Sequence, residues 1–149
     1  MNWALINFVW QYGFFALAVI VCGWAMSWGG RAERNAALLI LAGWTLSLIV
    51  QDHTPNGLDV PLALVDVVVC AILIFMSTRE RKPWLLLMAA AQFDTVMVHF
   101  AQWCVRYNIY PYAVALGLLS GVGQFPLLAW GVIQYRVVER RRWSNGTQA

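Results

Sequence analysis

The sequence has few charged residues. Of its 149 residues, only 11% are Asp, Glu, Lys or Arg, whereas 61% are hydrophobic. In soluble globular domains, about a quarter of the residues are charged. The mean hydropathy of this chain, +0.63, is also that of an apolar protein. The composition therefore argues against an ordinary soluble domain and predicts an all-α, polytopic membrane protein.

Cysteine is scarce as well. Cys22, Cys70 and Cys104 all lie within or at the end of apolar segments, their number is odd, and no CxxC spacing occurs. A disulfide framework or a zinc site needs paired or clustered cysteines. We therefore expect the three side chains to be small buried apolar groups.

The sequence motifs of common enzymes are absent. There is no GxSxG, HExxH, Walker or GxGxxG pattern. Ser120 precedes Gly121 in LLSGVG, which superficially resembles the serine segment of intramembrane serine proteases, but the only histidine expected inside the membrane lies on another helix and at a shallower level. No nucleophile and base are paired, so we expect no enzymatic activity, no catalytic residue and no cofactor.

Metal and nucleic-acid binding are not indicated either. Asp52, His53 and Asp59 share one loop, but their spacing is irregular and the intervening Pro-Asn-Gly is typical of a turn. The net charge of +3 comes from basic residues that flank the apolar segments, where they are topology signals. We expect no metal site and no nucleic-acid partner.

Five apolar segments dominate the chain. About 20 mostly apolar residues are needed to cross roughly 30 Å of hydrocarbon, and we expect spans at 3–28, 35–50, 61–77, 84–105 and 112–135, followed by a basic tail at 136–149. Nine tryptophans fit this assignment, because Trp is enriched at the membrane–water interface. The prediction is a single five-helix membrane bundle over residues 1–149.

The basic residues predict the topology of this bundle. Cytoplasmic loops carry an excess of Lys and Arg, and nine of the ten basic residues fall on one side of the expected spans, with only Arg106 on the other. This places the N-terminus outside and the C-terminus in the cytoplasm, in a bacterial inner membrane. The nine are Arg31, Arg34, Arg79, Arg81, Lys82, Arg136, Arg140, Arg141 and Arg142, and the last seven are expected at the membrane surface.

Three ionisable side chains fall inside the expected spans. At a rise of about 1.5 Å per residue, Asp66 on the third segment and His99 on the fourth lie at nearly the same level, and Asp94 lies about 7–8 Å deeper. Gln124, on the fifth segment, is also near the midplane. These residues form an expected intramembrane polar cluster, to which Gln92, Thr95 and Gln102 of the fourth segment belong.

The fourth segment is polar on two faces. At 100° per residue, Gln92, Thr95, His99 and Gln102 form one stripe, whereas Asp94 is about 140° away from His99. A charged side chain in hydrocarbon costs at least about 2.5 kcal/mol. We therefore expect this helix at the centre of the bundle, or with its second face against another subunit.

Small residues at helical spacing predict close contacts between helices. Gly117, Ser120 and Gly121 share one face of the fifth segment, and Gly43 and Ser47 are four residues apart on the second. Such residues let helix backbones approach each other in lipid.

Residues 62–104 resemble small uncharacterised integral membrane proteins of bacteriophages and prophages. The matching features are LVDVVV with Asp66, the basic turn with Arg79 and Arg81, Trp84, and the span that ends near His99. The resemblance implies a phage or prophage origin and no particular chemistry. The basic cytoplasmic tail is also similar to that of holins.

The sequence thus predicts a non-enzymatic inner-membrane protein that contacts lipid and self-associates, or acts as a subunit of a larger membrane complex, through its small-residue and polar helix faces. The alternative is an oligomeric pore or a proton or cation conduit, holin-like or channel-like, since intramembrane ionisable groups mark such paths. A third interpretation is purely structural: Asp66 bonds His99 across two helices, and Asp94 is protonated or capped by Gln124 or Thr95.

Overall fold

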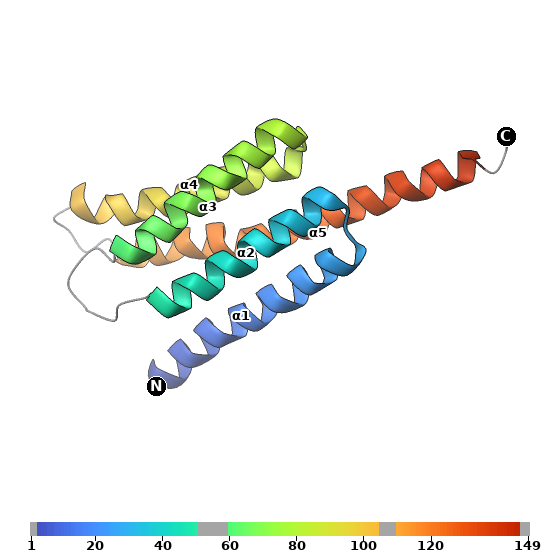
Figure 1. The fold of residues 1–149 in the computed structure, drawn as a ribbon. Coiled ribbons are helices and arrows are strands. Elements are labelled where there is room, and N and C mark those ends of the chain that lie inside the picture. Colours follow the sequence, from blue (N-terminus) through green and yellow to red (C-terminus); the bar gives the residue numbers. More distant parts are fainter. Residues whose placement is uncertain (1–2, 51–59, 105–109, 147–149) are drawn as a thin grey trace.

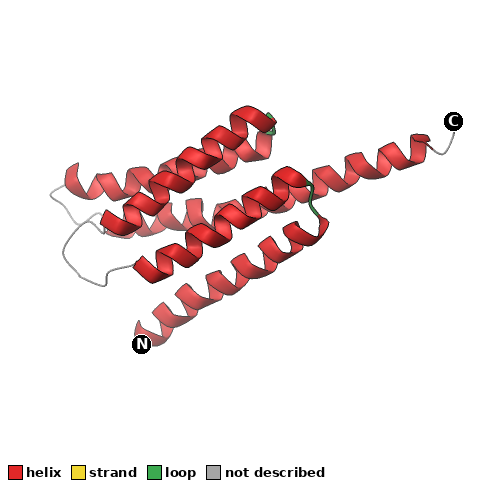
Figure 2. Ribbon diagram, viewed as in Figure 1, coloured by secondary structure: helices red, strands yellow, loops and turns green. Residues whose placement is uncertain are grey.

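A computed structural model of the protein shows five α-helices (Figures 1 and 2). It describes the backbone of residues 3–50, 60–104 and 110–146, and the side chains of residues 12–50, 60–99, 122–141 and 143. No strand occurs in these backbone ranges, so the all-α prediction is confirmed. The helices are α1 Trp3–Trp28, α2 Arg31–Val50, α3 Val60–Glu80, α4 Pro83–Cys104 and α5 Tyr110–Gly146.

The helices run up and down and pack side by side. The α1–α2 and α3–α4 turns lie at one end of the bundle, and the C-terminal part of α5 projects beyond that end (Figure 1). Each helix packs against its neighbours in sequence, α1 also packs against α5, and α2 meets α5 across the bundle. Among the described residues, α4 packs against α3 and α5 alone. The expectation of a central fourth helix is therefore wrong, and α2 and α5 take that place.

Three helices are longer than hydropathy predicts. α2 begins at Arg31 instead of residue 35, α3 continues to Glu80 instead of residue 77, and α5 continues to Gly146 instead of ending near residue 135. These extensions are rich in Arg and Glu, which are strong helix formers but are not apolar. Arg136 and Glu139, 3.7 Å apart and three residues along the helix, add an ion pair to the extension of α5.

The two turns at the common end are tightly built. In the α1–α2 turn, a Cβ atom on Gly30 would lie 2.6 Å from the ring of Tyr135, so only glycine fits there. In the α3–α4 turn, Arg81 has a left-handed φ of 52°, the conformation that commonly ends a helix. Pro83 then takes the first position of α4, where its fixed φ suits the helix. These turns fix which side chains of α1–α4 meet α5 at this end.

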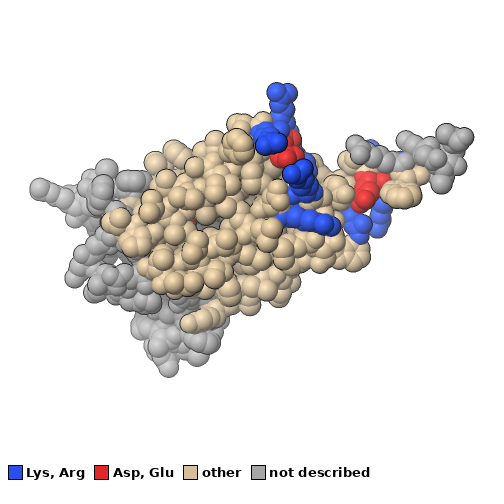
Figure 3. Space-filling model, viewed as in Figure 1, with Lys and Arg blue, Asp and Glu red and all other residues tan. Residues whose placement is uncertain are grey.

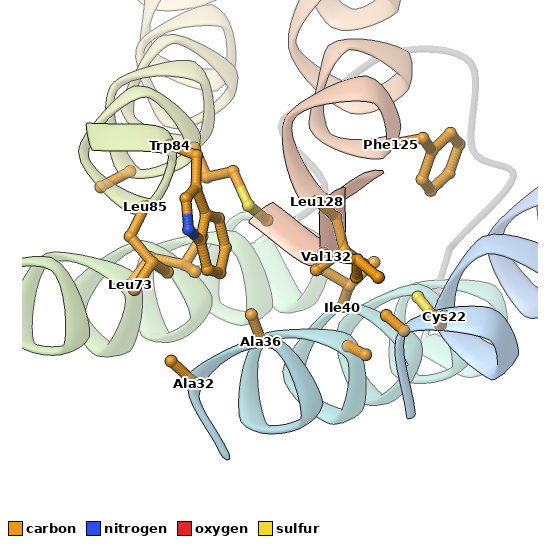
Figure 4. Close-up of a cluster of buried hydrophobic side chains, with 14 of the residues drawn as sticks. Cys22, Ala32, Ala36, Ile40, Leu73, Trp84, Leu85, Phe125, Leu128 and Val132 are labelled. Carbon is orange, nitrogen blue, oxygen red and sulfur yellow. The ribbon is translucent and has the colours of Figure 1, made fainter. Parts of the chain in front are cut away.

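An apolar core fills the same half of the bundle. Trp84 is fully buried and lies close to Leu85, Leu73, Leu128 and Val132 (Figure 4). Gly131 makes room for Trp84, because a Cβ atom at this glycine would be 2.6 Å from the indole ring. The half of the bundle next to the turns is therefore densely packed and apolar.

The outer surface of the bundle is also apolar. Within the described residues, α2 (Arg31–Val50) and α3 (Val60–Glu80) are long and apolar enough to cross a membrane, and Tyr12–Trp28 is a shorter apolar stretch. Only 28% of the apolar window in each of the two long helices is buried inside the protein. In the view of Figure 3, charged side chains gather at the end with the turns and along the projecting part of α5. The body of the bundle shows none from this side.

Candidate functional site

A chain of hydrogen bonds crosses three helices in the other half of the bundle. His99 Nε2 lies 2.8 Å from Asp66 Oδ2, and Gln92 Nε2 donates to Asp66 Oδ1 at 2.9 Å. Gln124 Nε2 in turn donates to Gln92 Oε1. We call these four side chains the polar relay. It ties α3 to α4 through Asp66, and α4 to α5 through Gln92.

The polar relay pairs every member with another. Both carboxylate oxygens of Asp66 accept a hydrogen bond, and the Gln92 amide donates on one side and accepts on the other. Gln92 and Gln124 are each 4% exposed. Asp66 and His99 are mostly buried. Buried polar groups without partners destabilise a fold, so this arrangement is what lets four polar side chains lie inside an apolar bundle.

A cavity of about 180 Å³ lies beside the polar relay. Asp66, Gln92 and Gln124 contribute to its wall together with Thr95 and Ser47. Such a cavity is large and polar enough to hold several water molecules. It can therefore extend the hydrogen-bond chain or accept a small polar ligand.

Neither the polar relay nor the cavity extends into the densely packed half. Directly beyond Gln124 come Phe125 and Leu128, which are 3% and 0% exposed, and α4 places the fully buried Met88 and Trp84 at that end. In the described part of the chain, these apolar side chains separate the polar relay from the end of the bundle with the α1–α2 and α3–α4 turns. We call this end the charged end, because charged side chains gather there (Figure 3). On this side, the polar relay and its cavity are therefore closed off by apolar side chains.

Asp94 lies away from the polar relay, on the outer face of α4. It is two residues beyond Gln92 and hence on the opposite side of the helix. Its neighbours on that face, Ala90, Phe93 and Met97, are exposed, and the last two are 50% and 42% exposed. The expected second polar face of α4 is present, and it points out of the bundle. Gln124, expected to cap Asp94, bonds Gln92 instead.

The remaining expected residues fall into three groups. A Cβ atom at Gly43 would lie 3.0 Å from Val69 Cγ2, so this glycine lets α2 and α3 approach closely, and Ser47 and Thr95 line the cavity. Cys22 and Cys70 are buried free thiols, and no cluster of three metal-binding side chains occurs among the described residues. The other residues singled out from the sequence lie outside the described residues or side chains: Asp52, His53, Asp59, Gln102, Cys104, Arg106, Gly117, Ser120, Gly121 and Arg142.

The sequence analysis did not predict a buried ion pair that lies at the charged end. Lys82 Nζ lies 2.6 Å from Glu33 Oε1, and Glu33 is 1% exposed. Lys82, expected at the membrane surface, is thus partly buried. Glu33 shares a face of α2 with Ala36, Ala37 and Ile40, which are all buried. This spacing was the one signal that could have placed Glu33 inside the bundle.

The other basic residues surround the charged end. Arg31, Arg34, Arg79, Arg81, Arg140 and Arg141 are exposed, and Figure 3 shows the Lys and Arg side chains gathered there and along α5. The Arg136 guanidinium lies 4.3 Å from the ring centre of Trp28, a cation–π contact that joins α5 to α1.

Comparisons with protein-family models, with curated proteins and with solved structures find no match for this chain. The features of this chain that bear on its function are the polar relay, the outer face of α4 and the charged end.

Proposed function

We propose that the protein is a non-enzymatic, five-span protein of the bacterial inner membrane that self-associates, or acts as a subunit of a larger membrane complex, through the outer face of α4. The observation that carries the proposal is the position of Asp94 among exposed apolar side chains. In this proposal the polar relay is the internal clamp that holds α3, α4 and α5 together.

Placement in a bilayer is supported by the outer surface. Large apolar residues such as Ile49, Leu64 and Phe75 are 73%, 63% and 61% exposed. Contiguous apolar surface of this extent is unusual on a soluble monomer but is what lipid requires. The charged residues at one end supply the asymmetry of cytoplasmic loops (Figure 3).

In a bilayer, the outer face of α4 needs a protein partner. A carboxylate at the centre of a membrane-spanning helix costs about 2.5–3.5 kcal/mol on insertion scales. No hydrogen bond or ion pair involves the Asp94 carboxylate within the described part of the chain, and Ala90 beside it is small. A small residue next to a polar one is typical of helix–helix interfaces in membranes. A second helix over this face would satisfy Asp94 and remove it from lipid.

The test is the oligomeric state in vesicles, counted by single-molecule photobleaching of the labelled full chain. We expect oligomers for the wild type and for Asp94→Asn, because an amide still forms hydrogen bonds. Asp94→Leu should raise the dissociation constant at least about tenfold, since about 1.4 kcal/mol lost at the interface has that effect.

Thr45→Leu is the matched control. Thr45 is an exposed polar residue of α2 whose hydroxyl already donates to the Leu41 carbonyl at 2.7 Å, so this variant should associate as the wild type does. A different protein that co-purifies in stoichiometric amount would identify a larger complex. A wild type that is monomeric and has no partner contradicts the proposal.

A second candidate function is a proton or cation conduit. It is favoured by the hydrogen-bonded series from His99 to Gln124 and by the adjoining cavity of about 180 Å³. Hydrogen-bonded ionisable chains serve as proton relays in membranes, and histidine changes charge near neutral pH. Water would have to cross the apolar packing around Trp84 for the path to continue.

Proton flux into liposomes loaded with a pH-sensitive dye tests this candidate. If the polar relay conducts, Asp66→Asn and His99→Gln should abolish the flux while oligomer content stays unchanged. Equal flux in the wild type, in both variants and in empty liposomes would remove the conduit.

A further inference from the structure

A large cavity opens at the charged end of the bundle, far from the polar relay. Its volume is about 790 Å³, within the range of small-molecule sites. α5 supplies most of its wall, and the buried pair Glu33 and Lys82 lies in the wall as well. Trp84, Trp130 and Trp143 also line it.

Lys82 and Glu33 form a dipole in the wall of this cavity, which Glu139, paired with Arg136 at 3.7 Å, also lines. Lys82 Nζ and Glu33 Oε1 lie 2.6 Å apart, and the Lys82 side chain remains 31% exposed whereas that of Glu33 is 1% exposed. The second oxygen of Glu33, Oε2, is buried and accepts no hydrogen bond within the described residues. A buried carboxylate oxygen without a donor is destabilising, and a ligand with an N–H donor would satisfy it.

The apolar part of the wall fits the interface of a bilayer. Ile133, Val137 and Val138 are 54%, 45% and 52% exposed, and they line the cavity next to the tryptophans. Indole rings favour the headgroup level of a membrane and attract cations over their faces. Lys82 itself lies 5.8 Å from the ring centre of Trp84.

We propose that this cavity binds the headgroup of a zwitterionic aminophospholipid, in which a phosphate and an ammonium group are joined by a short linker. On binding, the ammonium group replaces Lys82 at the Glu33 carboxylate and donates to Oε2 as well, and Lys82 turns to the phosphate. One ion pair is exchanged for two, and no charge stays unpaired. The apolar wall accommodates the beginning of the acyl chains. The site rests on the proposed placement of the chain in a bilayer.

The experiment is native mass spectrometry of the full chain released from nanodiscs of equal parts phosphatidylethanolamine and phosphatidylglycerol. The wild type should retain phosphatidylethanolamine over phosphatidylglycerol by about tenfold, as expected for one additional charge-assisted hydrogen bond. Glu33→Gln removes the carboxylate and releases Lys82, so its preference should invert toward the anionic lipid. Because a freed Lys82 attracts the anionic lipid by charge alone, the preference of the wild type for phosphatidylethanolamine is the discriminating result.

Glu80→Gln is the matched control, because Glu80 is an exposed carboxylate at the same end of the bundle and does not line the cavity. It should retain lipids as the wild type does. Equal retention of the two lipids by the wild type overturns the site without any variant. So does a preference that Glu33→Gln leaves unchanged.

A further measurement distinguishes binding of the lipid from binding of a free amine. In nanodiscs that lack phosphatidylethanolamine, octylammonium at the same molar ratio should raise the melting temperature of the wild type less than added phosphatidylethanolamine does. An equal or larger rise with octylammonium overturns the lipid assignment. Failure of the chain to enter nanodiscs at all would contradict the bilayer placement, which distinguishes the two proposals.

Discussion

Gln92 holds the centre of the polar relay, and its replacement by leucine is the most informative single change. The variant keeps a side chain of similar size but loses the hydrogen bond to Asp66 Oδ1 and the one from Gln124. The Gln124 amide, 4% exposed, is then left without this acceptor. The change therefore removes the hydrogen bond that ties α4 to α5 and one that ties α4 to α3, whereas the contact between His99 and Asp66 remains.

The expected loss follows from these two bonds. Interhelical hydrogen bonds in a membrane protein contribute about 0.6 kcal/mol on average and at most about 1.7. Gln92→Leu should thus lower the free energy of unfolding by about 1–3.5 kcal/mol. In Gln92→Leu/Gln124→Leu both ends of one bond become apolar, which can be nearly neutral, so the double variant should be less destabilised than the sum of the single variants by at least about 0.5 kcal/mol.

Reversible unfolding in mixed micelles, followed by far-ultraviolet circular dichroism, measures these free energies. Gln134→Leu is the matched control, because Gln134 is an exposed glutamine of the same helix as Gln124. It should change the free energy of unfolding by less than about 0.5 kcal/mol. If Gln92→Leu is no more destabilising than this control, or if the double variant is strictly additive, the polar relay is not a clamp.

Three further predictions concern packing, the buried charge and topology. Gly131→Val should lower the free energy of unfolding by about 1–3 kcal/mol, because its Cβ would meet the Trp84 ring at 2.6 Å. Gly123→Ala, whose Cβ would have nothing within 4 Å, should be neutral or stabilising. Equal effects of the two variants in the same unfolding assay would contradict the packing of Trp84 against Gly131. Lys82→Met should lower the free energy of unfolding by about 3 kcal/mol, since it leaves the buried Glu33 carboxylate without its ion-pair partner. Adding Glu33→Gln should restore most of this free energy. No restoration would show that Lys82 acts by packing alone. A C-terminal fusion of a reporter that is active only in the cytoplasm should be active, and an inactive but folded reporter would reverse the topology.

The sequence was most informative about the helices and the level of each polar side chain. Apolar segments located five helices, and counting residues along two antiparallel helices placed Asp66 beside His99, which the structure joins at 2.8 Å. The ends of α2, α3 and α5 were not predicted, because hydropathy does not register helical segments rich in Arg and Glu. The five spans and their orientation in the membrane stay a prediction.

Contacts that depend on the rotation of one helix relative to another could not be predicted from the sequence. Gln92 and Gln124 could be placed near one level, but only packing turns them toward each other and leaves Asp94 outside. Glu33 and Lys82 are 49 residues apart in the chain, and two tight turns bring them together. The sequence left two positions open for the fourth helix, either at the centre of the bundle or with its Asp94 face toward another subunit. In the structure, the Asp94 face of α4 lies on the outside of the bundle.

Cysteine cross-linking tests the outer face of α4 most directly. In a background without the native cysteines, Ala90→Cys places a thiol on the Asp94 face, and Phe75→Cys places one on the exposed face of α3. Oxidation in native membranes should link Ala90→Cys to a second copy, or to one distinct protein, and should leave Phe75→Cys monomeric. Cross-linking of Phe75→Cys to the same extent, or none at Ala90→Cys, would contradict a protein partner over Asp94.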